Sequence, residues 1–281
     1  MPIKNRIVWS PTRGRLLDRC TRRYVLEHVI EHYGTDSARL SKTRPLKDHA
    51  RRALRDAILD LLEAWSMHEE RTELESRGVI HRSLLQSIVS GHALESEPHD
   101  LVDGLVELML HRLRAIRNAP LIGRLKREVG NWQSVDRLQP LLLDGARQYG
   151  SPDLIFWNGD RLTLVRLTME TRSRVPDEVG ILEAGSMLLW AQRNPLIEIG
   201  LEQMDVVRVG WLGTRWVKWS KNGSQNWAGQ SRSLIAMDIE QMARCGLLDD
   251  IARRNGKEGL INFWDSQSRG TKKNIQLIEL I

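Results

Sequence analysis

The chain has 281 residues and a mass of 32.4 kDa, enough to bury a full core in one large or two small domains. Its 41% hydrophobic and 28% charged residues are typical of a folded globular protein and argue against disorder. The net charge of +6 is a modest excess that favours nucleic-acid partners. No apolar run approaches the ~20 residues that are needed to cross a bilayer. Since the first ten residues lack a secretion signal and there are only two cysteines, we expect a cytoplasmic protein without membrane contact, disulfide framework or metal knuckle.

The first half of the chain predicts helices. Ser10 or Thr12 is suited to cap a helix that runs to about Tyr33, and Pro45 opens a second helix from Leu46 to about Met67. Residues 79–118 predict one or two further helices with a break near Glu97-Pro98. Apolar residues at helical spacing are expected to face inward, namely Leu54, Ile58, Leu61, Leu62, Leu101, Leu105, Leu108 and Leu113. We therefore predict a helical N-terminal region over residues 1–130, packed on the core.

The second half, residues 131–281, predicts an α/β core with a C-terminal helix and tail. After a mixed segment 119–149 with a strand at Leu138–Leu143, two strands at 152–157 and 161–168 flank Asn158-Gly159, a dipeptide typical of tight hairpin turns. A helix at 176–193, a second hairpin of strands 204–211 and 215–220, a polar loop 221–231 and a helix at 232–254 follow. The tail from Gly259 ends in IQLIELI, which suits an edge strand or docking on a partner.

The first hairpin, GSPDLIFWNGDRLTLVRLT at 150–168, carries Asp153 at its first strand, and four other segments accompany it in a characteristic order. These segments read WSPTRGRLLDRCTRRYVLEHV, RLSKTRPLKDHARRALRDAILDLL, ILEAGSMLLWA and SLIAMDIEQMARCGLLDDIARRN. Together they resemble the RecB-like branch of the PD-(D/E)XK nuclease superfamily. The resemblance implies a central mixed β-sheet with a hairpin core flanked by helices, and it covers most of the chain.

Most of the chemistry that the resemblance implies is missing from this chain. Nuclease chemistry needs two carboxylates and a carbonyl to hold Mg²⁺, and a lysine to orient the attacking water. In the register of the resemblance, the second acid and the lysine become Val165 and Leu167, which share one face of the strand. Other family positions also change: the usual Gly, His, Gln and Tyr become Arg51, Arg55, Glu183 and Met187, and the cysteines of an iron-sulfur cluster are absent. The loss of these groups together favours a scaffold relieved of catalysis.

Two rescue candidates keep an active enzyme as an alternative. Asp153 could bind Mg²⁺ weakly with the help of substrate phosphates, and Glu170 with Arg172 offers an acid and a cation just beyond the strand. Glu170 has the wrong parity relative to Val165, so a β-bulge would be required to turn it back. His49, one and a half turns from Arg55, is the second candidate, although a lone helical His is more often a packing residue.

Arginine clusters and tryptophans suggest binding surfaces. Basic residues crowd three segments: Arg13, Arg15, Arg19, Arg22 and Arg23; His111, Arg112, Arg114, Arg117, Arg124, Lys126 and Arg127; and Arg269, Lys272 and Lys273. Guanidinium groups bind phosphates or carboxylates as bidentate partners, and a solvated helix face is the competing interpretation for each cluster. Trp211, Trp216 and Trp219 in the second hairpin could stack on unpaired bases, but core or interface roles are commoner.

From these patterns we expect a catalytically degenerate nuclease-like protein, more a binding subunit than an enzyme, in a DNA-processing or antiviral-defence complex. Candidate nucleic-acid contacts are Arg19, Arg22, Arg23, Arg51, Arg55, Arg166 and Arg172. DNA and protein subunits, with a helicase as one candidate, are the expected partners, and no cofactor is expected. The alternatives are an active Mg²⁺-dependent nuclease with Asp153 as metal ligand and Glu170 as displaced acid, and a protein-interaction scaffold without nucleic-acid contact.

Overall fold

A computed structural model describes residues 7–20, 24, 46–90, 99–136, 140–143, 146–170, 178–212, 215–222 and 227–245. The chain divides into two compact units, each assembled from separate stretches. Unit 1 comprises residues 1–41, 139–150 and 229–281, and unit 2 comprises residues 42–138 and 151–228. The sequence suggested a helical region over residues 1–130 packed on a core of residues 131–281, and that division stays a prediction.

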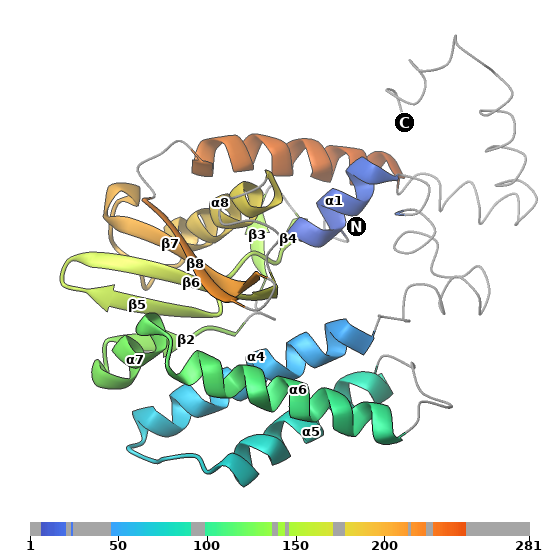
Figure 1. Cartoon of the computed structure of the whole chain (residues 1–281). Coiled ribbons are helices and arrows are strands. Elements are labelled where there is room, and N and C mark those ends of the chain that lie inside the picture. The colour runs from blue at the N-terminus through green and yellow to red at the C-terminus, as the bar shows by residue number, and fades with distance from the viewer. Residues whose placement is uncertain are drawn as a thin grey trace, which may run out of the picture. The chain divides into compact units, whose positions relative to one another are not determined.

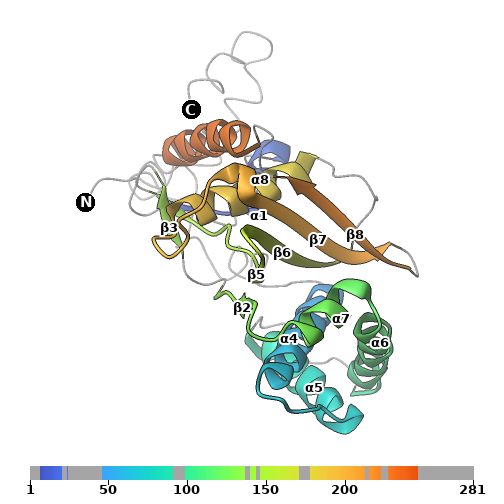
Figure 2. The same cartoon turned by 90° about the vertical axis from the view of Figure 1, so that its left-hand side faces the viewer.

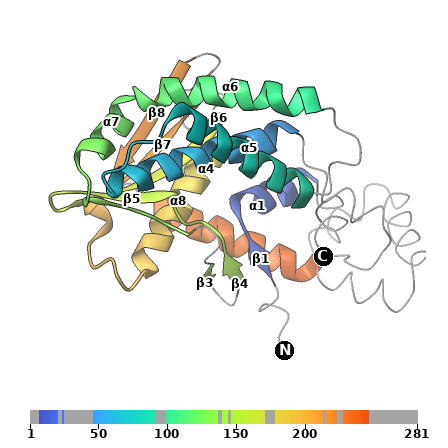
Figure 3. The ribbon, with the colours of Figure 1, turned by 90° about the horizontal axis from the view of Figure 1, so that it is seen from below.

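Four helices form one layer of unit 2 (Figures 1 and 3): α4 (Leu46–Ser66), α5 (Glu73–Ser90), α6 (His99–Arg117) and α7 (Pro120–Arg127). Helix α4 begins at Leu46 as predicted, and its four predicted inward residues, Leu54, Ile58, Leu61 and Leu62, are at most 1% exposed. Pro120 stands in the first turn of α7, where the missing amide hydrogen costs nothing. Helix α7 lies in the segment 119–149, whose pattern is mixed and did not predict a helix.

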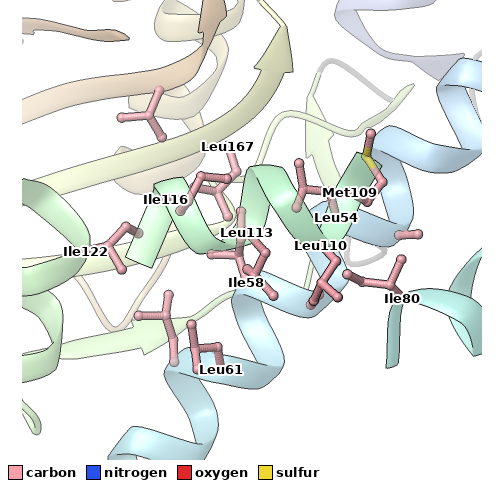
Figure 4. Close-up of a cluster of buried hydrophobic side chains, with 14 of the residues drawn as sticks. Leu54, Ile58, Leu61, Ile80, Met109, Leu110, Leu113, Ile116, Ile122 and Leu167 are labelled. Atoms are coloured by element: carbon pink, nitrogen blue, oxygen red, sulfur yellow. The ribbon is translucent and has the colours of Figure 1, made fainter. Parts of the chain in front are cut away.

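The buried stripe of α6 differs from the predicted one. Leu101 and Leu108 are 45% and 44% exposed, so the prediction that they face inward was wrong. Leu113 is 1% exposed and confirms its prediction, but the buried residues before it are offset by one position: Val102, Val106 and Met109 are at most 4% exposed. Figure 4 shows Met109 and Leu113 against the leucines and isoleucines of α4. Both stripes have helical spacing, and only the packing against α4 distinguishes them.

The sheet of unit 2 has the strand order β2-β5-β6-β7-β8. Its members are β2 (Trp132–Ser134), β5 (Leu154–Asn158), β6 (Arg161–Glu170), β7 (Met204–Leu212) and β8 (Arg215–Asn222). Only β6 and β7 run parallel, and the chain between them forms α8 (Glu178–Arg193) and a short 3-10 helix, Leu201–Gln203. In Figures 1 and 2, α4 and α6 lie on one face of this sheet and α8 lies on the other.

Both predicted hairpins are present, with a small shift at the first turn. Asn158 pairs with Arg161, so Gly159 and Asp160 are the two loop residues instead of Asn158-Gly159. Gly159 has φ +62°, and Asp160 does not have a positive φ, which excludes the turn type that needs positive φ at both positions. The second hairpin is also present, but β7 includes Leu212, which was predicted to lie in the turn, and β8 extends to Asn222, two residues beyond the predicted strand.

Unit 1 contains a second sheet of three short strands in the order β1-β4-β3 (Figure 3): β1 (Val8–Trp9), β4 (Ala146–Gln148) and β3 (Leu141–Leu143). Helix α1 (Pro11–Arg19) follows β1, with Ser10 as its N-cap accepting from the Arg13 amide at 3.3 Å. Residues 227–245 form the last described helix, and residues 246–254 of the predicted helix lie outside the described residues.

Two predictions on the segments of unit 1 need correction. The first helix ends at Arg19 with an extended Cys20, although the sequence predicted it to continue to about Tyr33; Tyr24 is again helical, and most residues beyond it lie outside the described residues. The strand expected at Leu138–Leu143 leads into β4 and not into the hairpin sheet. The strand that pairs with β5 is β2, which lay unrecognised in the mixed segment.

The described protein is therefore an α/β fold with mixed sheets, as expected. Among the helices that the structure describes, none is both long enough and apolar enough to cross a membrane.

Candidate functional site

The two faces of strand β6 carry different side chains. Val165 and Leu167 belong to the hydrophobic cluster that α4 and α6 build with the sheet. Leu154 pairs with Val165, so Asp153, one residue earlier, points to the opposite face and shares it with Arg166. Val165 and Leu167, which the resemblance set at the positions of the second acid and the lysine, therefore face the hydrophobic cluster and not Asp153. Arg166 is the residue of β6 that stands beside Asp153.

Asp153 is fully buried and is held by the backbone around it. Its Oδ2 accepts a hydrogen bond from the Leu167 amide at 2.7 Å, and its own amide donates to the Val165 carbonyl at 2.8 Å. The Asp153 carbonyl accepts from the Val135 amide at 3.0 Å, which continues the pairing of β2 with β5. The Asp153 carboxylate therefore links the chain just before β5 to the backbone of β6 at Leu167.

The Arg166 guanidinium reaches three oxygens although the side chain is only 4% exposed. Its Nη1 lies 3.7 Å from Asp153 Oδ2, and its Nη2 donates to the Ser151 carbonyl at 2.7 Å. Its Nε lies 3.0 Å from Oε1 of Glu183, which comes from α8 on the same face of the sheet. A buried guanidinium requires such partners, because an unpaired buried charge is strongly unfavourable.

Glu183 also binds a second arginine. Its Oε2 lies 2.8 Å from Nη2 of Arg208, which is 14% exposed and stands beside Arg166 in the parallel β6–β7 ladder. Two arginines side by side repel each other, and attraction to the Glu183 carboxylate that both contact offsets that repulsion. We call Asp153, Arg166, Glu183 and Arg208 the charge quartet. Its two carboxylates and two guanidinium groups sum to zero formal charge.

Sequence reasoning identified three members of the quartet in other roles and missed Arg208. A signal for Arg208 exists in VVRVG, where one arginine interrupts a β-branched run that predicts a buried strand. A charged residue in such a run needs a buried partner of opposite sign. The partner came from a helix 25 positions earlier in the chain, a distance at which sequence periodicity carries no information.

The Mg²⁺ that the nuclease resemblance implies does not fit this arrangement. The guanidinium of Arg166 lies against the same types of oxygen, two carboxylates and a backbone carbonyl, that would bind the ion. Among the described residues, no group of three or more His, Cys, Asp and Glu side chains is placed to hold a metal ion. The quartet as it stands is a buried salt-bridge network.

Other predicted site residues lie apart from the quartet or outside the description. Arg19 is exposed at the end of α1, and Arg22, Arg23 and Arg172 lie outside the described residues. Glu170 closes β6 opposite Trp211, after a register shift between Leu167 and Met169 at the point where a bulge was required, but the Glu170 side chain lies outside the description.

Helix α4 carries three of the singled-out residues. Arg51 pairs with Asp48 at 2.6 Å and Arg55 with Asp56 at 2.7 Å, so both guanidinium groups bind acids of their own helix. His49 is 2% exposed, and its Nδ1 lies 2.7 Å from the Ser87 hydroxyl of α5. His49 is thus a packing residue between two helices, as the commoner interpretation held.

The second basic cluster is largely neutralised by three acids: one before α5, one at the start of α5, and one directly after α7. Arg114 pairs with Glu73, Lys126 with Glu70, and Arg124 with Glu128 at 2.8 Å; Arg117 lies 3.6 Å from Glu70. These pairs favour the solvated-face interpretation for this cluster. The third cluster and the side chains of Trp211, Trp216 and Trp219 lie outside the described residues.

Unit 1 holds a separate buried acid, Asp238, on the helix of residues 227–245. Its Oδ2 accepts from the Trp9 indole Nε1 at 2.7 Å, and the residue is 8% exposed. Burial raises the pKa of Asp238 to about 6; the Trp9 hydrogen bond opposes this and the nearby Asp18 carboxylate adds to it. Burial likewise raises the pKa of Tyr24 to about 12.

No family model, curated protein or solved structure matches this chain. The nuclease resemblance therefore depends on the five sequence segments alone.

Proposed function

We propose that this chain is a catalytically degenerate nuclease-like protein that serves as a nucleic-acid-binding or architectural subunit of a DNA-processing or antiviral-defence complex. The observation that carries the proposal is Arg166, whose guanidinium lies 3.7 Å from Asp153, the one carboxylate that the resemblance retains. A cation fixed to the chain at this point repels a divalent ion. At ~4 Å and an effective dielectric constant of about 20, the repulsion between +1 and +2 charges is about 8 kcal/mol.

The order of elements supports the kinship with RecB-like nucleases. A long helix α4, the β5–β6 hairpin, the crossover helix α8 and a late helix over residues 227–245 follow one another as the corresponding segments do in the resemblance. Conversely, Val165 and Leu167 pack in the hydrophobic core, so this face offers no oxygen to a metal. A fold kept without its reactive groups is best explained by a binding or assembly role.

Binding to nucleic acid is supported by charge and exposure. The chain carries +6 at neutral pH, and Arg19 is an exposed arginine in the first basic cluster. Arg51 and Arg55 each bind an acid of their own helix, and the side chains of both pairs are partly exposed to solvent. Ion pairs that solvent screens are worth about 1 kcal/mol or less. Phosphates can compete for both side chains at that strength. Arg166 is too deeply buried to reach a phosphate in this conformation.

Cleavage is tested with end-labelled single- and double-stranded DNA in Mg²⁺ or Mn²⁺, resolved on denaturing gels. The native protein is compared with Asp153→Asn and with Asp103→Asn, a matched change at an exposed acid of α6. We expect intact DNA in all lanes at protein concentrations that bind it. Cleavage by the native protein that only Asp153→Asn abolishes would reject the proposal.

Binding is tested by fluorescence anisotropy across a salt series. A subunit that contacts phosphates through Arg19 shows a log Kd that rises with log salt, and Arg19→Gln lowers that slope by about 1. Arg82→Gln, an exposed arginine of α5 outside the clusters, is the control and leaves the slope unchanged. Absence of binding at low salt would leave the protein-interaction scaffold as the surviving function.

One observation favours the active nuclease as a second candidate. The register shift after Leu167 is the irregularity that Glu170 would need in order to act as a displaced ligand. Under this alternative, Glu170→Gln abolishes cleavage as completely as Asp153→Asn does. The same gels therefore decide between the two candidates.

A further inference from the structure

Helix α5 has apolar residues on two opposite faces. One face packs on α4 and α6 and buries Ile80, Leu84 and Ile88, each 0% exposed. On the opposite face, Leu74 is 79% exposed and Val89 is 71% exposed. In Figures 1 and 2, α5 lies on the outer side of the helical layer, farther from the sheet than α4. The outer face of such a helix is normally polar, so the second apolar face of α5 requires its own explanation.

The outward apolar residues of α5 form a narrow stripe. Leu74, Gly78, Leu85 and Val89 follow one another at intervals of four, seven and four residues, which places them on one side of the helix over about 22 Å. We call these four residues the α5 stripe. Nothing lies within 4 Å of the place where a Cβ of Gly78 would stand, so a side chain of a partner has room between Leu74 and Leu85. Helices that pair side by side present apolar residues at the same intervals.

The charge at the edge of the α5 stripe is positive. Arg82 is exposed and lies four residues after Gly78. Its charged neighbours on the helix already have partners, since Arg77 pairs with Glu107 at 2.7 Å and Glu75 accepts from the Thr72 hydroxyl at 2.8 Å. No acid in the described part of the chain pairs with Arg82. The stripe therefore combines apolar surface with one cation that is not neutralised.

We propose that the α5 stripe docks an acidic amphipathic helix of another protein subunit. The apolar residues of that helix cover Leu74, Leu85 and Val89, and one of its carboxylates pairs with Arg82. A helix suits this surface better than an extended segment, because the backbone of α5 is bonded within the helix and offers no edge for strand pairing. The inference deepens the architectural role in the proposed function, and it rests on that proposal for the existence of a partner subunit.

A second copy of this chain fits the α5 stripe less well. Two α5 helices that run in opposite directions can match Leu74 with Val89 and Gly78 with Leu85 across the interface. The centre of that arrangement falls next to Arg82, so the Arg82 side chains of the two copies come together. Like charges placed opposite each other disfavour association, whereas a carboxylate of a different helix neutralises Arg82.

Synthetic peptides test the inference by fluorescence anisotropy with the full-length protein. Each peptide has about 20 residues and spans roughly 30 Å as a helix. The first peptide carries a heptad stripe of leucines flanked by glutamates. The second has lysine in place of every glutamate, and the third has the composition of the first in an order without a stripe. We expect the glutamate peptide to bind at least tenfold more tightly than either of the others.

Variants assign the binding to the α5 stripe. Leu74→Ser/Val89→Ser should weaken the glutamate peptide at least tenfold, because both anchoring side chains are lost. Arg82→Glu should weaken the glutamate peptide and strengthen the lysine peptide, each about fivefold, a reversal that loss of apolar surface does not produce. Leu101→Ser/Leu108→Ser, which changes two leucines of α6 that are 45% and 44% exposed, is the matched control and should leave both affinities unchanged. Since all these side chains are exposed, the circular dichroism spectra should stay native.

Four results overturn the inference. They are absence of binding by the glutamate peptide, equal binding by the peptide without a stripe, an affinity that neither α5 variant changes, and dimerisation in sedimentation runs that Leu74→Ser/Val89→Ser abolishes. The last result would assign the stripe to a second copy of the chain. No DNA is present in these titrations. Cleavage of DNA by the native protein would refute the proposed function and leave the peptide results standing, so the two failures are distinguishable.

Discussion

Asp238 gives unit 1 a pH dependence that can be worked out in sign and size. Its carboxylate is 8% exposed, and burial raises its pKa to about 6 from 3.8. A raised folded-state pKa means that its stabilising contribution is fully present below pH 3.8 and is lost as the pH rises through 6. The shift of about 2.2 units, at 1.36 kcal/mol each, makes the folded state about 3 kcal/mol less stable at pH 7 than at pH 3.5 through this group alone.

The substitution Asp238→Asn isolates that contribution. Asparagine keeps an oxygen that can accept the hydrogen bond from the Trp9 indole, which is 2.7 Å long in the native protein. Unlike the carboxylate, the amide does not titrate. Carboxylates that do not interact with Asp238 titrate equally in both proteins, so their effects cancel in the difference. We expect the free energy of unfolding of Asp238→Asn, relative to the native protein, to rise by about 3 kcal/mol between pH 3.5 and 7.

Urea unfolding followed by circular dichroism at several pH values measures this difference, and a carboxyl-carbon NMR titration reports the pKa directly. The NMR midpoint for Asp238 should lie near 6. A midpoint below about 4, or a stability difference that stays constant within ~0.5 kcal/mol over the pH range, would refute the burial argument. Asp18, whose pKa burial also raises, should be titrated in parallel because it faces the same carboxylate.

Further predictions concern the charge quartet and three glycines. A double-mutant cycle of Asp153→Asn and Arg166→Met should give a coupling free energy of about 4 kcal/mol, from a 3.7 Å separation at an effective dielectric constant of about 20; additive effects in urea unfolding would contradict it. Gly14→Ala should lower the Tm, because the new Cβ would come closer than 3.0 Å to the carboxylate that accepts from the indole of strand β1. Gly159→Ala should destabilise by roughly 1–2 kcal/mol, since φ there is +62°. Gly104→Ala, with nothing within 4 Å of its Cβ on α6, should instead stabilise by about 1 kcal/mol, and thermal unfolding compares all three.

Local chemistry in the sequence was sufficient where it was strong. Pro45 marked the start of α4, and Asn158-Gly159 located the first hairpin to within one residue. The helix predicted at 176–193 ends at Arg193, as α8 does. In each case a proline, a glycine that permits positive φ, or a clear apolar period determined the element. These signals act within a few residues, so one sequence is enough to read them.

Features that depend on tertiary contacts were not readable in this way. The stripe of α6 is buried on the side of Val102 and not of Leu101, because α4 and α5 lie on that side. Strand β2 has only three residues, too few for a period, and exists through its pairing with β5. Arg208 and Glu183 meet because a parallel ladder and a crossover helix bring them together. Chain-local patterns contain none of this information.

The division of the molecule into interleaved units bears on how the chain is made. Strand β1, at residues 8–9, pairs with β4, at residues 147–148, so it has no sheet partner until about 140 further residues have been synthesised. At 5–20 residues per second, that interval is roughly 7–28 s. The hydrogen-bond partner of the Trp9 indole, Asp238, is synthesised later than β4. All residues of unit 2 precede residue 229, so unit 2 can be complete while unit 1 still lacks the helix that carries Asp238.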